Sequence, residues 1–145
     1  MSINEFMKFH RERSQGLSVF EVLVPDSTVT SNEIEEVEKQ MNCKLPISYK
    51  DFCMVYGGGY FGFVIIFSMD KLGEWFILDK IKESNDYLPK NYLPFSDDQA
   101  GGLYCFKIEN NIVIDEIYYI DSWGGVVKSK ENDFYDFLIL NAYSS

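Results

Sequence analysis

Apolar side chains recur at helical spacing in four stretches of the chain, and each stretch predicts an amphipathic helix. The second stretch opens on Thr30 and Glu33, a pairing that predicts a capping box at the start of the helix. This helix should end before Leu45-Pro46, because a residue that precedes proline avoids the α region. The four predicted helices cover residues 2–15, 30–44, 47–56 and 131–143.

Five further stretches are rich in aromatic and β-branched residues and predict strands. They cover residues 60–68, 92–96, 103–108, 112–120 and 126–128. Both faces of the first stretch are apolar, which predicts a central strand. Asn110-Asn111 predicts a hairpin turn between the third and fourth strands, because Asn tolerates a positive φ. This mixture of helices and strands predicts an α+β fold.

Two stretches carry weaker patterns. Residues 17–24 alternate loosely between apolar and polar, which predicts a short strand that Pro25 ends. Residues 75–85 are ambiguous and favour a helix over their second half.

Gly57, Gly59 and Gly62 match the GxGxxG spacing of dinucleotide-binding loops. In such loops the glycines follow a strand and open a helix, whose N-terminus binds the pyrophosphate. Here they follow a predicted helix and open a predicted strand. The pattern therefore predicts the end of a helix and a tight turn, and no cofactor is expected.

The length of 145 residues fits a single domain, residues 1–145. The cysteines, Cys43, Cys53 and Cys105, form no CxxC pair, so their spacing favours buried, reduced thiols over a zinc site. The first residues lack the basic and apolar regions of a signal peptide. No apolar stretch approaches the ~20 residues of a membrane span. These features predict a cytoplasmic protein with no metal and no membrane contact.

Acidic residues outnumber basic ones by 23 to 13, which gives a formal net charge of −10. This balance argues against nucleic acid as a direct partner, because phosphate binding needs Lys and Arg to release counterions. An acidic protein is instead suited to a basic protein partner. The acidic excess is concentrated in residues 96–136, where nine acids stand against three bases.

Paired carboxylates such as Asp97-Asp98 are typical of cation binding or acid–base catalysis. Neighbouring residues of a strand face opposite sides of the sheet, however. The favoured interpretation is a turn in which the carboxylates accept backbone N–H groups. By the same logic Asp115-Glu116 predicts a solvated face, and His10 has no catalytic partner at a motif spacing. No enzymatic activity is expected, and a metal-dependent hydrolase is the disfavoured alternative.

Residues 118–125 place Tyr and Trp among acidic side chains in a predicted loop, as in the anchors of protein interfaces. In the alternative interpretation, one of the tyrosines packs into the core and Trp123 covers it. If the loop forms an interface, the predicted contacts with a protein partner are Asp97, Asp98, Glu116, Tyr118, Asp121 and Trp123.

The order of several short motifs resembles the SUKH superfamily in its Smi/Knr branch. The motifs are the acidic run from Thr30 to Glu38, the sequence LPISYKDF at 45–52, the glycines at 57–59, and LPFSDDQAGG at 93–102. The similarity covers residues 28–143. It implies an α+β fold with a curved, mostly antiparallel sheet flanked by helices. It offers no catalytic residues to transfer to this chain.

Bacterial members of this superfamily resemble immunity proteins, which bind a cognate secreted toxin domain, often a nuclease, and block it without catalysis. The resemblance therefore implies a basic toxin as partner, and an acidic inhibitor gains electrostatic steering toward it. Fungal members regulate cell-wall synthesis, which implies a regulatory scaffold as the alternative. We expect a monomer or a weak homodimer.

Overall fold

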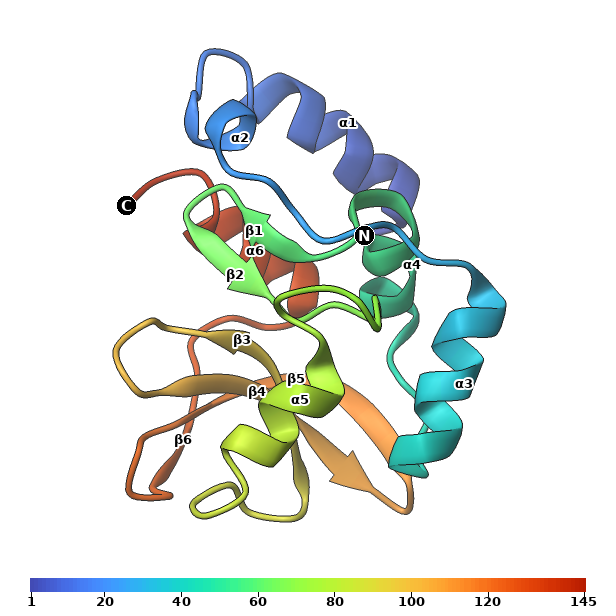
Figure 1. Ribbon diagram of the computed structural model, residues 1–145. Helices are drawn as coiled ribbons and strands as arrows, with labels where there is room; N and C mark the ends of the chain where they lie inside the picture. Colours follow the sequence, from blue (N-terminus) through green and yellow to red (C-terminus); the bar gives the residue numbers. More distant parts are fainter.

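The computed structural model describes residues 1–145 and contains six helices and one six-stranded antiparallel sheet (Figure 1). The strands neighbour one another in the order in which they occur along the chain, from β1 to β6. The elements are α1 (Ile3–Arg13), α2 (Val19–Val22), α3 (Ser31–Met41), α4 (Ile47–Tyr56), β1 (Gly59–Phe61), β2 (Val64–Ile66), α5 (Ile77–Glu83), β3 (Tyr92–Asp97), β4 (Leu103–Glu109), β5 (Ile112–Ile120), β6 (Val126–Lys128) and α6 (Phe134–Asn141).

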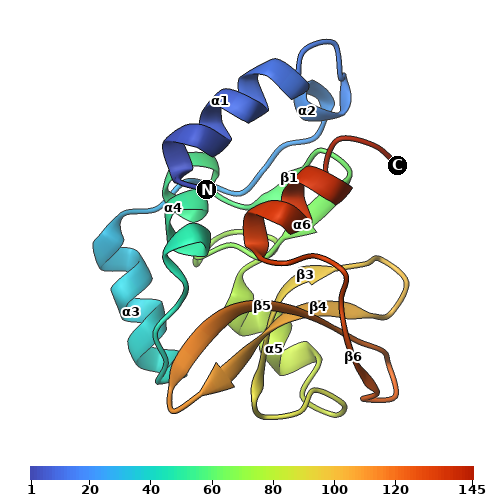
Figure 2. The same ribbon diagram turned by 180° about the vertical axis from the view of Figure 1, so that it is seen from behind.

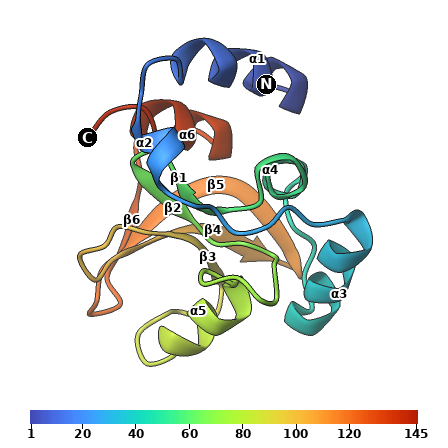
Figure 3. The same cartoon turned by 45° about the horizontal axis from the view of Figure 1, so that its top comes forward.

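Helices cover both faces of the curved sheet. Figure 3 shows α4 and α6 on one side of it, with α1 beyond them, and α5 on the other side. The view from behind shows α3 beside the end of the sheet that β5 reaches (Figure 2). This arrangement confirms the predicted α+β fold with a curved antiparallel sheet. None of the six helices combines the length and the apolar character that spanning a bilayer requires.

An aromatic core joins α4 and α6 to the sheet. The ring of Tyr49 on α4 lies 5.3 Å from that of Phe134 on α6 and 5.6 Å from that of Phe106 on β4. Phe95 of β3 stacks on Phe106 at 4.4 Å. The Tyr49 hydroxyl, which burial would otherwise leave without a partner, donates to the Phe67 carbonyl oxygen at 2.6 Å. Burial of these rings is the main stabilisation of the contact between the helices and the sheet.

Local sequence signals fix several elements as predicted. The capping box is present, since the Thr30 hydroxyl accepts from the Glu33 amide at 3.2 Å and Glu33 accepts from the Thr30 amide at 3.1 Å. Helix α4 spans the predicted residues. Asn110 and Asn111 both have positive φ, 51° and 63°, and join β4 to β5 as a hairpin. The three cysteines are buried and free, also as predicted.

The predicted strand over residues 17–24 is wrong, because this segment forms the short helix α2. The same residues that alternate loosely also place Leu17 and Phe20 three positions apart, which suits one helical turn. The Phe20 ring lies 5.2 Å from that of Phe61 and 5.3 Å from that of Tyr143. Packing against β1 and the C-terminal segment therefore outweighs a weak local preference for strand.

The predicted central strand over residues 60–68 is also wrong. It is a hairpin of two short strands, β1 and β2, and β1 lies at an edge of the sheet. The chain reverses at Gly62, whose φ is 56°, and a Cβ at this position would collide with the Ala142 carbonyl and the Phe20 ring. The ring of Phe61 is buried by aromatic rings of α1, α2, α4 and the C-terminal segment, whereas Tyr60 on the other face is half-buried beside Trp75, so these residues did not require a central position.

Two carboxylates, those of Asp115 and Glu38, have structural roles in the fold. Asp115 accepts from the Phe134 amide at the start of α6 and from the Ser48 hydroxyl on α4, both at 2.7 Å. Partial burial raises the pKa of Asp115, although those hydrogen bonds oppose the change. Glu38 is buried and accepts from the Leu45 amide at 2.7 Å, which fixes the connection from α3 to α4. The prediction of a solvated face was therefore wrong for Asp115.

Candidate binding surface

Four of the six predicted contact residues gather at one end of the sheet, where two turns meet. The β3–β4 turn follows Asp97 and contains Asp98, and the β5–β6 turn contains Asp121 and Trp123. Figure 1 shows both turns on the left of the sheet. The two turns lie in van der Waals range of each other. A Cβ atom placed on Gly101 of the β3–β4 turn would lie 3.7 Å from the Cβ atom of Ser122 in the β5–β6 turn.

We call this region the turn-end surface. It comprises these two turns together with the adjoining exposed parts of β5 and β6, and its members are Asp97, Asp98, Glu116, Tyr118, Asp121, Trp123, Val126 and Val127.

Asp98 links the first turn to β5. One of its oxygens accepts from the amides of Ala100 and Gly102, at 2.7 and 2.8 Å, and the other accepts from the Tyr119 hydroxyl at 2.6 Å. Burial by itself would raise the pKa of Asp98, but these three hydrogen bonds outweigh it and lower the pKa. Donation to Asp98 in turn raises the pKa of Tyr119 to about 12. The Asp98 charge is therefore used mainly to hold the turn.

Asp97 and Asp121 each accept backbone N–H groups with only one carboxylate oxygen. The Asp97 oxygen accepts from the Gln99 amide at 2.5 Å. The Asp121 oxygen accepts from the amides of Trp123 and Gly125, at 2.8 and 3.0 Å. Both residues remain partly exposed. This geometry confirms the turn interpretation of Asp97-Asp98, and it leaves negative charge facing solvent at both turns.

Glu116 and Tyr118 lie on β5, away from the turns. The Tyr118 ring contacts the Tyr92 ring of β3 at 5.2 Å, and the Lys128 ammonium lies 5.4 Å from its centroid. The Tyr118 hydroxyl is 3.4 Å from an oxygen of the exposed Glu116. These two residues thus extend the turn-end surface along the face of the sheet.

Trp123 is the most exposed large side chain of this surface, with 92% of its area accessible. The alternative in which Trp123 covers the core is therefore wrong. Tyr119, by contrast, points inward and contacts Tyr104 at 5.2 Å, and Tyr104 contacts Phe137 of α6 at 4.8 Å. Trp is one of the residue types that most often contribute strongly to protein interfaces, and here it stands exposed on a turn that hydrogen bonds hold in place.

Strand β6 adds apolar area that sequence reasoning missed. It is the last strand of the sheet and pairs only with β5, so its outer edge is free. All three of its residues are exposed, and Val127 is 62% accessible. The adjacent valines, Val126-Val127, are the only sequence signal for this patch, because a strand with one buried face would normally alternate.

The cysteines and the single histidine, which could act as nucleophiles, bases or metal ligands, lie outside this surface and are buried or surrounded by other side chains. Burial raises the pKa of Cys43 to about 11, so its thiol is protonated at neutral pH. His10 is enclosed by aromatic rings, its Nδ1 lies 2.9 Å from the Tyr143 hydroxyl, and burial lowers its pKa. No group of three or more His, Cys, Asp or Glu side chains is arranged to hold a metal ion. Of the glycines in the GxGxxG pattern, Gly57 ends α4 and Gly59 opens β1, as predicted, whereas Gly62 lies in the turn between β1 and β2.

Comparison with known proteins identifies the fold and the family. No curated protein shows significant sequence similarity to the chain. A solved structure described as "Crystal structure of protein from Pseudomonas syringae pv. tomato" has the same fold, with a TM-score of 0.66 over 94% of this chain and 95% of that chain, at 16% sequence identity. A family model described as "SMI1-KNR4 cell-wall" matches residues 31–138, which is most of the chain. The chain therefore belongs to this SMI1-KNR4 family (SUKH_6) of the SUKH superfamily.

Proposed function

We propose that this chain is an immunity protein, which binds a basic toxin domain through the turn-end surface and blocks it without making or breaking a bond. The observation that carries the proposal is the exposed Trp123, held on a turn by Asp121 and bordered by carboxylates. Family membership supports it, because SUKH proteins of the immunity type act by binding.

The two components of the surface have separate roles in this proposal. The carboxylates of Glu116 and Asp121 attract a basic partner over several ångströms and raise the association rate. Trp123 and Val127 become buried only when the partner is bound. Dissociation would expose them to water again, so they lower the dissociation rate. The cytoplasm of the cell that makes the toxin is the compartment in which such protection is needed.

The first test is co-expression of the chain with the product of the gene beside it, followed by pull-down. We expect a stable complex, and we expect Trp123→Ala to weaken it by at least 2 kcal/mol, about thirtyfold in Kd, if Trp123 is a central anchor. Leu72→Ala is the matched control, because Leu72 is 97% accessible in the loop between β2 and α5, outside the turn-end surface. Equal affinity of the Trp123 and Leu72 variants would refute the assignment of this surface.

A regulatory scaffold is the second candidate, and the cell-wall description of the family model favours it. A scaffold would bind several cellular proteins and protect against no toxin. Recovery of the same set of cellular proteins in repeated pull-downs, with no protection against the neighbouring gene's product, would favour this alternative.

A further inference from the structure

A groove of about 430 Å³ lies between the C-terminal end of α3, helix α5 and the first residues of β3. Its apolar lining includes Met41 of α3, Ile81 of α5 and Leu88 of the following loop, together with Leu93 of β3 and Ile108 of β4. This volume falls within the ~300–1,000 Å³ of sites that accept a drug-sized ligand. No residue of the two turns of the turn-end surface lines the groove, although the two regions adjoin: Tyr92 contacts Tyr118, and a Cβ added at Gly124 would lie 2.9 Å from the Tyr87 carbonyl oxygen.

The walls of the groove are apolar but incompletely buried. Leu78 and Ile81 lie three positions apart on α5 and are each partly exposed, as are Met41 and Leu88. Residues of the same types in the core are almost fully buried. No element of the chain covers this face of α5, so the groove is an apolar surface that folding alone leaves open to water.

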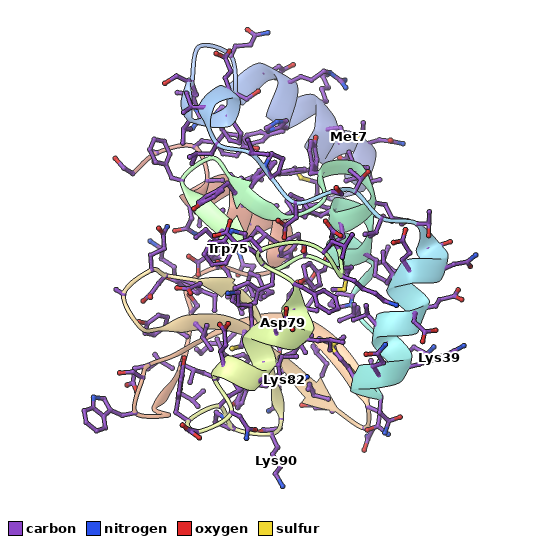
Figure 4. The ribbon with its side chains drawn as sticks, in the orientation of Figure 1. Met7, Lys39, Trp75, Asp79, Lys82 and Lys90 are labelled. Carbon is purple, nitrogen blue, oxygen red and sulfur yellow. The ribbon has the colours of Figure 1, made fainter.

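The charge at the groove is opposite to that of the molecule. Lys82 and Lys90 line it and no carboxylate does, although the chain carries a net charge of −10. The three ion pairs of the structure use Lys50, Lys80 and Lys107, so neither groove lysine has a carboxylate partner. Figure 4 shows Lys82 on α5 and Lys90 projecting from the loop that follows it.

We propose that this groove binds an acidic amphipathic helical segment of another protein, with apolar side chains in the groove and carboxylates on Lys82 and Lys90. The apolar walls match the face of a helix with residues at i, i+3 and i+4, a recurring mode of peptide recognition. The exposed rim residues Gln40 and Asn85 leave the groove open, so that a helix can lie across it. The unpaired lysines select the sign of charge. This site is independent of the proposed toxin contact.

The test uses the full chain, labelled with nitrogen-15, and a synthetic probe peptide with leucines at i, i+3, i+4 and i+7 and glutamates at most other positions. We expect the amide resonances of Met41, Ile81 and Ile108 to shift on titration, whereas those of Trp123 and Gly125 stay in place. A second probe, with lysines in place of the glutamates, should bind at least tenfold more weakly. Ile81→Glu should weaken binding of the first probe by a similar factor.

Charge reversal provides a variant that does not disturb the core. Lys82→Glu with Lys90→Glu should invert the preference, so that the lysine probe binds more tightly than the glutamate probe. Lys8→Glu with Lys71→Glu is the matched control, because both residues are exposed and neither lines the groove. No binding of the glutamate probe, equal affinity for both probes, or shifts confined to the turn-end surface would overturn the proposal. Concentration-dependent shifts of the groove amides without any peptide would assign the groove to a second copy of the chain and would overturn it as well.

Discussion

At the scale of single residues, the carboxylates of the turn-end surface divide into two kinds. Asp98 is fully engaged by two amides and one hydroxyl, whereas Glu116 is exposed and meets only the Tyr118 hydroxyl at 3.4 Å. Sequence reasoning predicted the turn at Asp97-Asp98, because an Asp that accepts a nearby amide is a local event. It did not identify Tyr119 as a partner, since that contact joins residues 21 positions apart.

Loss of the Tyr119 hydroxyl should destabilise the fold. Tyr119→Phe removes a hydrogen bond to an ionised carboxylate, and we expect the free energy of unfolding to fall by about 1–2 kcal/mol. Tyr118→Phe is the matched control, because its hydroxyl makes only a long contact at an exposed position, and its effect should be within ±0.5 kcal/mol. Urea denaturation of both variants measures the difference. Equal losses would contradict the structural role of the link between Asp98 and Tyr119.

The lowered pKa of Asp98 makes a contribution to stability that depends on pH. Because the pKa in the folded state lies below the unfolded value of ~3.9, the contribution is present above that pH and is lost as the pH falls through the folded value. Asp98→Asn removes the titrating group. The urea midpoint of the native chain should therefore exceed that of Asp98→Asn at pH 6, and the difference should shrink below about pH 4. A difference that grows on acidification would show the opposite linkage.

At the scale of elements, the helices and strands that were predicted correctly are those whose sequence signals are local. The capping box of α3, the limits of α4 and the Asn110-Asn111 turn were predicted because each is set by residues within a few positions. Helix α2 and the β1–β2 hairpin were not predicted, because their conformations depend on packing contacts of Phe20, Ala142 and Tyr143. Contacts of this kind join distant parts of the chain and leave no periodic pattern in the sequence.

Asp115 offers a test of how such distant contacts place α6. Asp115→Ala leaves the Phe134 amide and the Ser48 hydroxyl without their acceptor, so we expect a loss of about 1–3 kcal/mol in the free energy of unfolding. Its neighbour provides the control, because Glu116→Ala at an exposed position should change stability by less than about 0.5 kcal/mol. Thermal or urea unfolding distinguishes the two. A negligible effect of Asp115→Ala would mean that α6 is held by its apolar face alone.

At the scale of the whole molecule, the proposed function depends on the placement of charge and exposed apolar area. The net charge and the acidic excess in residues 96–136 follow directly from the amino-acid sequence. The placement of Asp97, Asp98 and Asp121 in two adjacent turns required the sheet order, which brings these turns to one end. The charge balance could therefore be predicted from the sequence, while the shape of the surface depended on the tertiary structure.

Charge reversal on the turn-end surface should act mainly on association with the proposed toxin partner. Glu116→Lys should lower the association rate and flatten its dependence on salt, because steering is a long-range effect that salt screens. Glu36→Lys is the matched control, since Glu36 is exposed on α3 and outside this surface. Stopped-flow association at several ionic strengths measures both variants. If they slow association equally, only net charge matters and this surface has no special role.

The most direct measurement is the survival of cells that express the neighbouring gene, whose product we propose to be the toxin, with and without the chain itself. The proposed function predicts that the native chain restores growth and that Trp123→Ala, folded and expressed at the same level, protects less well than Leu72→Ala. Equal killing in the presence and absence of the native chain would contradict it.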